Sequence, residues 1–145
     1  MEQLTSDQAR QVWQRVRGGD EQASPLPRLL ALEAQIQHTY QYLRRNTPLR
    51  DSRLLSRLSE DSRHFATVLA GICAQLEQDH TIQAPPSVRG NCTGLLRLCY
   101  QARMESLSLL ERLPGAISVP VVILRRQMEN HILTLLELLG QIREK

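Results

Sequence analysis

The stretch DHTIQAPPSVRGN at residues 79–91 is the one substantial linker in the chain, and it decides how the rest is arranged. Its paired prolines, its glycine and its asparagine are strong breakers of regular structure. The long segments on either side carry apolar residues at helical spacing and almost no strand pattern. We therefore predict an all-α chain that this linker divides into two halves.

Cap signals divide each half into two helices. Ser24-Pro25 and Thr47-Pro48 each pair a capping hydroxyl with a first-turn proline, and Ser118 with Pro120 repeats the pattern. Pro114-Gly115 ends the segment before Ser118. We predict bundle helices at residues 25–45, 48–78, 92–113 and from 118 onward.

A shorter helix is predicted near the start of the chain, capped by Thr5 and stopped by Gly18-Gly19. The predicted organisation is a short N-terminal helix within residues 1–20 and a four-helix bundle spanning residues 25–145.

The lengths of the connections predict the topology of the bundle. The first and third connections are short, so each pair of helices forms an antiparallel hairpin. A twelve-residue extended linker reaches roughly 40 Å, and helices of about 20–30 residues are roughly 30–45 Å long. The linker at 79–91 can therefore cross the whole bundle, which predicts one long crossover between the second and third bundle helices.

Bulk composition excludes several classes of protein. The chain has 145 residues, 41% hydrophobic and 23% charged, which fits one globular domain. No apolar run is long enough for a membrane span, and the start of the chain has no signal pattern, so we expect a cytoplasmic protein. The net charge of +3 is scattered along helices with few aromatic residues, and we expect no nucleic-acid partner. Three cysteines without a C-x-x-C pair do not suggest a disulfide framework, and Cys73 and Cys99, which lie among leucines, are predicted to be reduced core residues.

Polar residues interrupt the apolar stripe of each long helix. A buried polar group costs free energy unless it has a partner, so these residues are the candidates for a site. Carboxylate and imidazole ligands suit iron or manganese, and a spacing of i, i+3 places two of them on one helix face. The candidate metal ligands are Glu33, Asp61, His64, Glu105 and His131.

Four segments resemble the ferritin-like family, and within it the small rubrerythrin-like bacterial proteins that lack a rubredoxin domain. They are LEAQIQHTY at 32–40, DSRH at 61–64, CYQARME at 99–105 and MENH at 128–131. The resemblance implies a ferritin-like four-helix bundle with iron or manganese in its core and oxidoreductase chemistry on peroxide or oxygen.

Three residues depart from the family pattern. Asp61 and Met128 stand where the family has glutamates, and Arg103 faces the metal position if the third bundle helix turns it inward. Two alternatives therefore stay open. The chain is either a metal-binding protein with an eroded site, or a metal-free bundle that serves as a structural or protein-interaction module. A homodimer is the expected assembly.

Overall fold

The computed structural model describes residues 24–76, 85, 87–113 and 118–143. Within them the chain forms four long helices and no strand, which confirms the predicted all-α class. The helix predicted within residues 1–20 lies outside the described residues. The long helices are α2 (Leu26–Asn46), α3 (Arg53–Gln75), α4 (Cys92–Leu110) and α5 (Val119–Arg143).

Local capping explains where the helices begin. The Ser24 hydroxyl accepts the amide of Leu26 at 3.1 Å before α2, and the Asn91 side chain accepts the amide of Gly94 at 2.7 Å before α4. Gly90 precedes this cap with a φ of 134°, a conformation that glycine adopts without steric cost.

The start of α3 differs from the prediction. Thr47-Pro48 opens a 3-10 turn, η1 (Pro48–Asp51), and not the α-helix itself. Ser52 then has extended backbone, and its hydroxyl accepts the amide of Leu55 at 3.2 Å, so the α-helix begins at Arg53.

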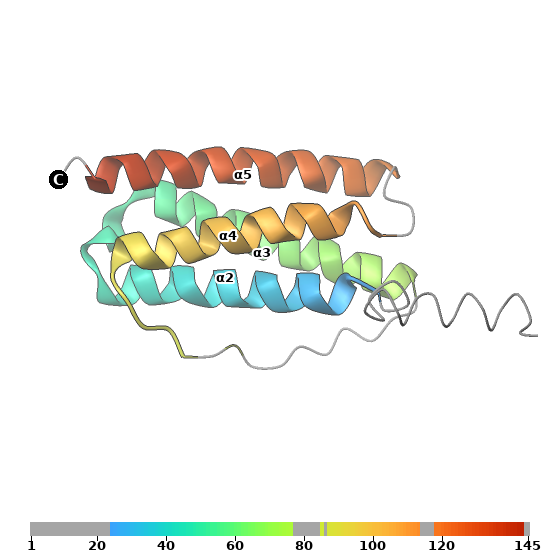
Figure 1. Cartoon of the computed structure of the whole chain (residues 1–145), viewed down its shortest axis with the longest axis horizontal. Coiled ribbons are helices and arrows are strands. Elements are labelled where there is room, and N and C mark those ends of the chain that lie inside the picture. Colours follow the sequence, from blue (N-terminus) through green and yellow to red (C-terminus); the bar gives the residue numbers. More distant parts are fainter. Residues whose placement is uncertain (1–23, 77–84, 86, 114–117, 144–145) are drawn as a thin grey trace, which may run out of the picture.

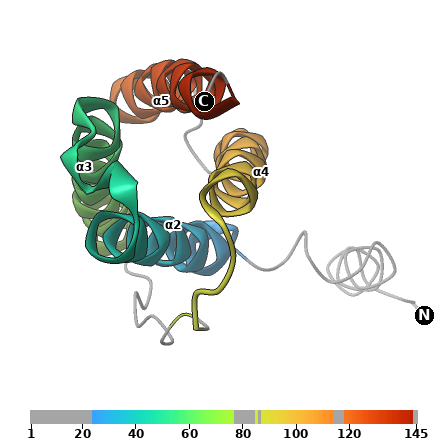
Figure 2. The same ribbon diagram turned by 90° about the vertical axis from the view of Figure 1, so that its left-hand side faces the viewer.

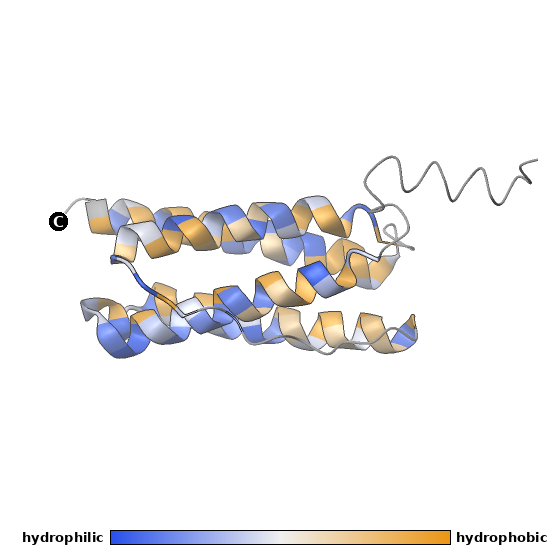
Figure 3. Ribbon diagram, turned by 60° about the horizontal axis from the view of Figure 1, so that its bottom comes forward, coloured by the Kyte–Doolittle hydropathy of each residue, from blue (hydrophilic) through white to orange (hydrophobic). Residues whose placement is uncertain are grey.

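The four helices form a ring in which α2 and α5 lie diagonally opposite each other (Figure 2). The main contacts join α2 to α3 and α4, and α5 to the same two helices. Viewed from the side, α3 and α4 run in one direction while α2 and α5 run in the other (Figure 1). Along each helix, apolar and polar residues alternate by turns, as amphipathic helices require (Figure 3).

The apolar core consists of two clusters, one toward each end of the bundle. One cluster joins the start of α2 and α5 to the end of α3 and α4, around Leu29, Phe65 and Leu124. The other joins the opposite ends of the same helices, around Tyr40, Leu58 and Leu96. Buried polar side chains from all four helices lie at the level between them, and this polar layer is the candidate site. None of the described helices has an apolar stretch long enough to cross a membrane.

Candidate functional site

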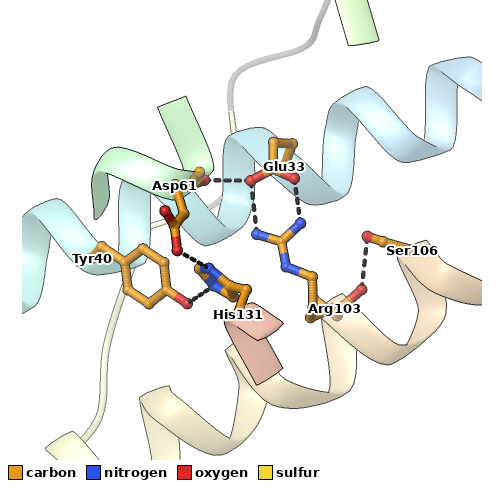
Figure 4. A network of polar contacts seen from close by, with 8 residues as sticks. Glu33, Tyr40, Asp61, Arg103, Ser106 and His131 are labelled. Atoms are coloured by element: carbon orange, nitrogen blue, oxygen red, sulfur yellow. Dashed lines mark hydrogen bonds and ion pairs between the residues drawn. The ribbon is translucent and has the colours of Figure 1, made fainter. Parts of the chain in front are cut away.

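The centre of the polar layer is an ion pair between α4 and α2 (Figure 4). The two terminal nitrogens of Arg103 donate to the two carboxylate oxygens of Glu33, at 2.5 and 2.8 Å. The Ser62 hydroxyl on α3 donates to the same carboxylate. The guanidinium also lies over the Phe65 ring, with its carbon 4.8 Å from the ring centroid. One cation thus ties three helices together.

The charges of this pair are almost fully removed from water. Arg103 is 0% exposed and Glu33 is 1% exposed. Burial acts to lower the pKa of Arg103, but the Glu33 carboxylate outweighs it and holds that pKa above its ordinary value. Arg103 is therefore charged. The buried Arg103 Nε has no hydrogen-bond partner among the described residues, so the bidentate contact compensates the buried charge without satisfying every donor.

Beside the ion pair, His131 links a buried phenol to a carboxylate near the surface. Its Nε2 lies 2.7 Å from the Tyr40 hydroxyl, and its Nδ1 lies 3.4 Å from an Asp61 oxygen. Burial lowers the pKa of His131, while the Asp61 contact opposes the shift. The neutral ring then carries its proton on Nδ1, facing Asp61, and Nε2 accepts from the Tyr40 O–H. The Asp61 side chain is 37% exposed, so the chain of contacts from Tyr40 through His131 to Asp61 reaches solvent at Asp61.

Burial also keeps the neighbouring acidic groups protonated. It raises the pKa of Tyr40 well above its ordinary range and that of Cys99 to about 12. At neutral pH the phenol and the thiol are uncharged, which fits the prediction that Cys99 is a reduced core residue.

The predicted metal ligands do not converge. The Glu33 carboxylate is bound by Arg103, and His131 is the only other candidate that Asp61 contacts. His64 is exposed, and Glu105 pairs with Arg28 at the surface at 2.7 Å. Among the described residues, no group of three or more His, Cys, Asp or Glu side chains is placed to hold a metal ion.

Helix phase explains these placements. The inward stripe of α3 contains Leu58, Ser62 and Phe65, which leaves Asp61 at its edge and turns His64 to solvent. On α4 the inward residue is Arg103. Glu105 lies two positions further along and therefore points to a different side of the helix.

Ser62 is a member of this layer that was not predicted. It lies four residues after Leu58 and three before Phe65, so the apolar stripe of its helix did contain the signal. Tyr40 and Met128 are each 0% exposed.

Comparisons with known proteins find no match to this chain. No protein-family model, no curated protein and no solved structure matches the chain. The ferritin-like resemblance therefore stays an expectation drawn from the sequence.

Proposed function

We propose that this chain is a bundle of ferritin-like topology in which an ion pair stands in place of the metal centre, and that it acts as a protein-interaction module. The observation that carries this proposal is the Arg103 guanidinium, which lies at mid-bundle and binds both oxygens of Glu33.

The helix directions support the ferritin-like topology. Because α3 and α4 run in parallel, α3 ends at one end of the bundle and α4 begins at the other (Figure 1). A chain that joins such ends must travel the length of the bundle, as the single crossover of ferritin-like bundles does.

The ligand chemistry argues against a metal centre. A divalent metal needs several oxygen or nitrogen ligands around one point. Here Glu33 offers its oxygens to a cation that is already fixed, and that cation would repel a metal ion beside it. Asp61 and His131 are too few to hold iron or manganese in a stable site, and His64 and Glu105 face other directions.

The outer face of α5 supports an interaction role. Val122, Leu133 and Leu136 are 43%, 63% and 46% exposed, although they are large apolar side chains. They belong to a stripe of exposed residues at alternating spacings of three and four, the pattern by which one helix packs along another. The full stripe is Val119, Val122, Arg126, Glu129, Leu133, Leu136 and Gly140.

A second copy of the chain is the partner that fits this stripe. In an antiparallel pair of α5 helices, Val122 faces Gly140 of the other copy and Glu129 faces Leu133. The same alignment brings Arg126 beside Glu137 of the other copy, twice by symmetry. A parallel pair would instead stack Glu129 on Glu129. Charge thus favours the antiparallel homodimer.

Metal loading tests the central claim. The full chain is incubated with Fe(II) without oxygen, desalted and analysed for metal; a parallel sample receives Mn(II). We expect a stoichiometry near zero and a melting temperature unchanged by either ion or by a chelator, because the described residues hold no group of three or more ligands that could bind a metal preferentially in the folded state. About one or two ions per chain, lost in the Asp61→Ala and His131→Ala variants, would overturn the proposal.

A further inference from the structure

A concave basic site lies between the end of α2, the η1 turn and α3, away from the polar layer. Its cavity has a volume of about 350 Å³. The lining residues are Gln41, Arg44, Arg45, Arg50, Ser59 and Arg63. We call this site the arginine pocket.

The charge in the arginine pocket is uncompensated. Four of its six lining residues are arginines, and none is a carboxylate. None of these four side chains makes an ion pair or hydrogen bond with a described residue, whereas Arg28, Arg103 and Arg125 each contact a glutamate. Like charges gathered in one concavity repel one another, so their convergence is unfavourable without an anion.

A serine hydroxyl opens into the pocket beside the arginines. Ser59 lines the pocket and its side chain makes no hydrogen bond with any described residue, yet its oxygen is not a fully buried atom. A ligand oxygen at the floor of the pocket would supply a hydrogen-bond partner.

We propose that the arginine pocket binds a polyphosphate group. Guanidinium groups form paired hydrogen bonds to phosphate oxygens, and arginine is the preferred side chain for this geometry. Four converging cations match a pyrophosphate, with its several negative charges, better than a single carboxylate. Ser59 and Gln41 add neutral hydrogen-bonding groups, which fix position more than they add charge.

The polyphosphate group can come from a free phosphate chain or from a nucleotide. A second cavity, of about 280 Å³, shares Gln41 and Arg45 with the arginine pocket and is also lined by His38 and Tyr42. The rings of these two residues offer a stacking surface for a base. Comparison of pyrophosphate with ADP therefore distinguishes the two sources.

Calorimetric titration of the full chain with pyrophosphate tests this site, in a phosphate-free buffer of fixed ionic strength. We expect one pyrophosphate per chain, and weaker binding of sulfate at the same ionic strength. Arg63→Gln should weaken binding about tenfold or more, because a charged hydrogen bond is lost. Arg57→Gln, which removes the same charge from an exposed position of α3 outside the pocket lining, should leave it unchanged.

The remaining outcomes also decide the question. ADP binding tighter than pyrophosphate identifies a nucleotide, and equal binding identifies a free phosphate chain; both support the site. Equal losses in Arg63→Gln and Arg57→Gln would reveal attraction to overall charge and overturn it. Displacement of pyrophosphate by a single-stranded RNA at lower concentration would overturn the assignment to a small ligand. Circular dichroism of each variant establishes that it remains folded.

Discussion

Arg103 joins three helices, because its stem leaves α4 while its guanidinium binds Glu33 on α2 and covers Phe65 on α3. A buried ion pair of this kind adds little net stability compared with apolar residues of the same shape. Loss of one partner is strongly destabilising, since the remaining charge stays buried without compensation. The pair therefore contributes more to the specific arrangement of the helices than to the stability of the fold.

A double-mutant cycle separates these two effects. We expect Arg103→Met and Glu33→Leu each to lower the free energy of unfolding by about 3–5 kcal/mol. The double variant should lose far less than the sum, because both charges leave the core together. Urea denaturation of the four proteins measures the coupling. Additive losses would show that the two side chains do not depend on each other.

His131 makes stability depend on pH through its buried ring. Its folded pKa lies below the ordinary value of 6.5 because of burial, with Arg103 adding to the shift and Asp61 and Glu33 opposing it. Below about pH 6.5 His131 binds a proton more readily in the unfolded chain than in the folded chain, so the free energy of unfolding decreases as pH falls. The slope from this residue is at most about 1.4 kcal/mol per pH unit.

Urea denaturation between pH 7.5 and 5 measures this slope. His131→Asn should flatten it, whereas His64→Asn should keep it, because His64 is exposed. Equal slopes in the wild type and in His131→Asn would contradict the assignment.

At the level of whole elements, caps and apolar spacing predicted the four long helices within a few residues of their ends. The start of α3 was predicted too early, because a Thr-Pro pair can open a 3-10 turn as well as an α-helix. The hydroxyl of Ser52, nearer the helix proper, supplies the cap. Both signals are in the sequence, but only the fold decides between them.

The site was harder to predict, because it depends on the rotation of each helix. Arg103 and Glu105 lie two residues apart near mid-bundle, and the sequence left open which of them faces inward. The structure buries Arg103. Glu105 was a candidate ligand because it interrupts the apolar stripe of its helix, and a rotation of two residues places it at the surface instead.

At the scale of the whole molecule, the apolar residues that remain outside concentrate on α4 and α5. Among the described residues, the large apolar side chains that are exposed are Leu98, Met104, Val119, Val122, Ile123, Leu133 and Leu136. The α5 stripe continues into a cavity of about 430 Å³ that Tyr100 and Leu139 help to line. Large exposed apolar side chains gathered on one side of a protein are typical of an interaction surface.

Sedimentation of the full chain over a range of concentrations tests self-association through this face. We expect a monomer–dimer equilibrium that Leu133→Glu combined with Leu136→Glu shifts at least tenfold toward the monomer. In the antiparallel pair, the new carboxylate at position 133 would face Glu129 of the other copy, where like charges repel, and both substitutions remove apolar area from the interface. Leu98→Glu is the matched control, because Leu98 is 50% exposed on α4 and lies outside the stripe.

Charge reversal refines the test: Arg126→Glu should weaken the dimer, and adding Glu137→Arg should restore it, since each copy then offers the opposite charge to its neighbour. If none of these four substitutions changes the dimerisation constant, the dimer forms through another face of the bundle and α5 is not the interface.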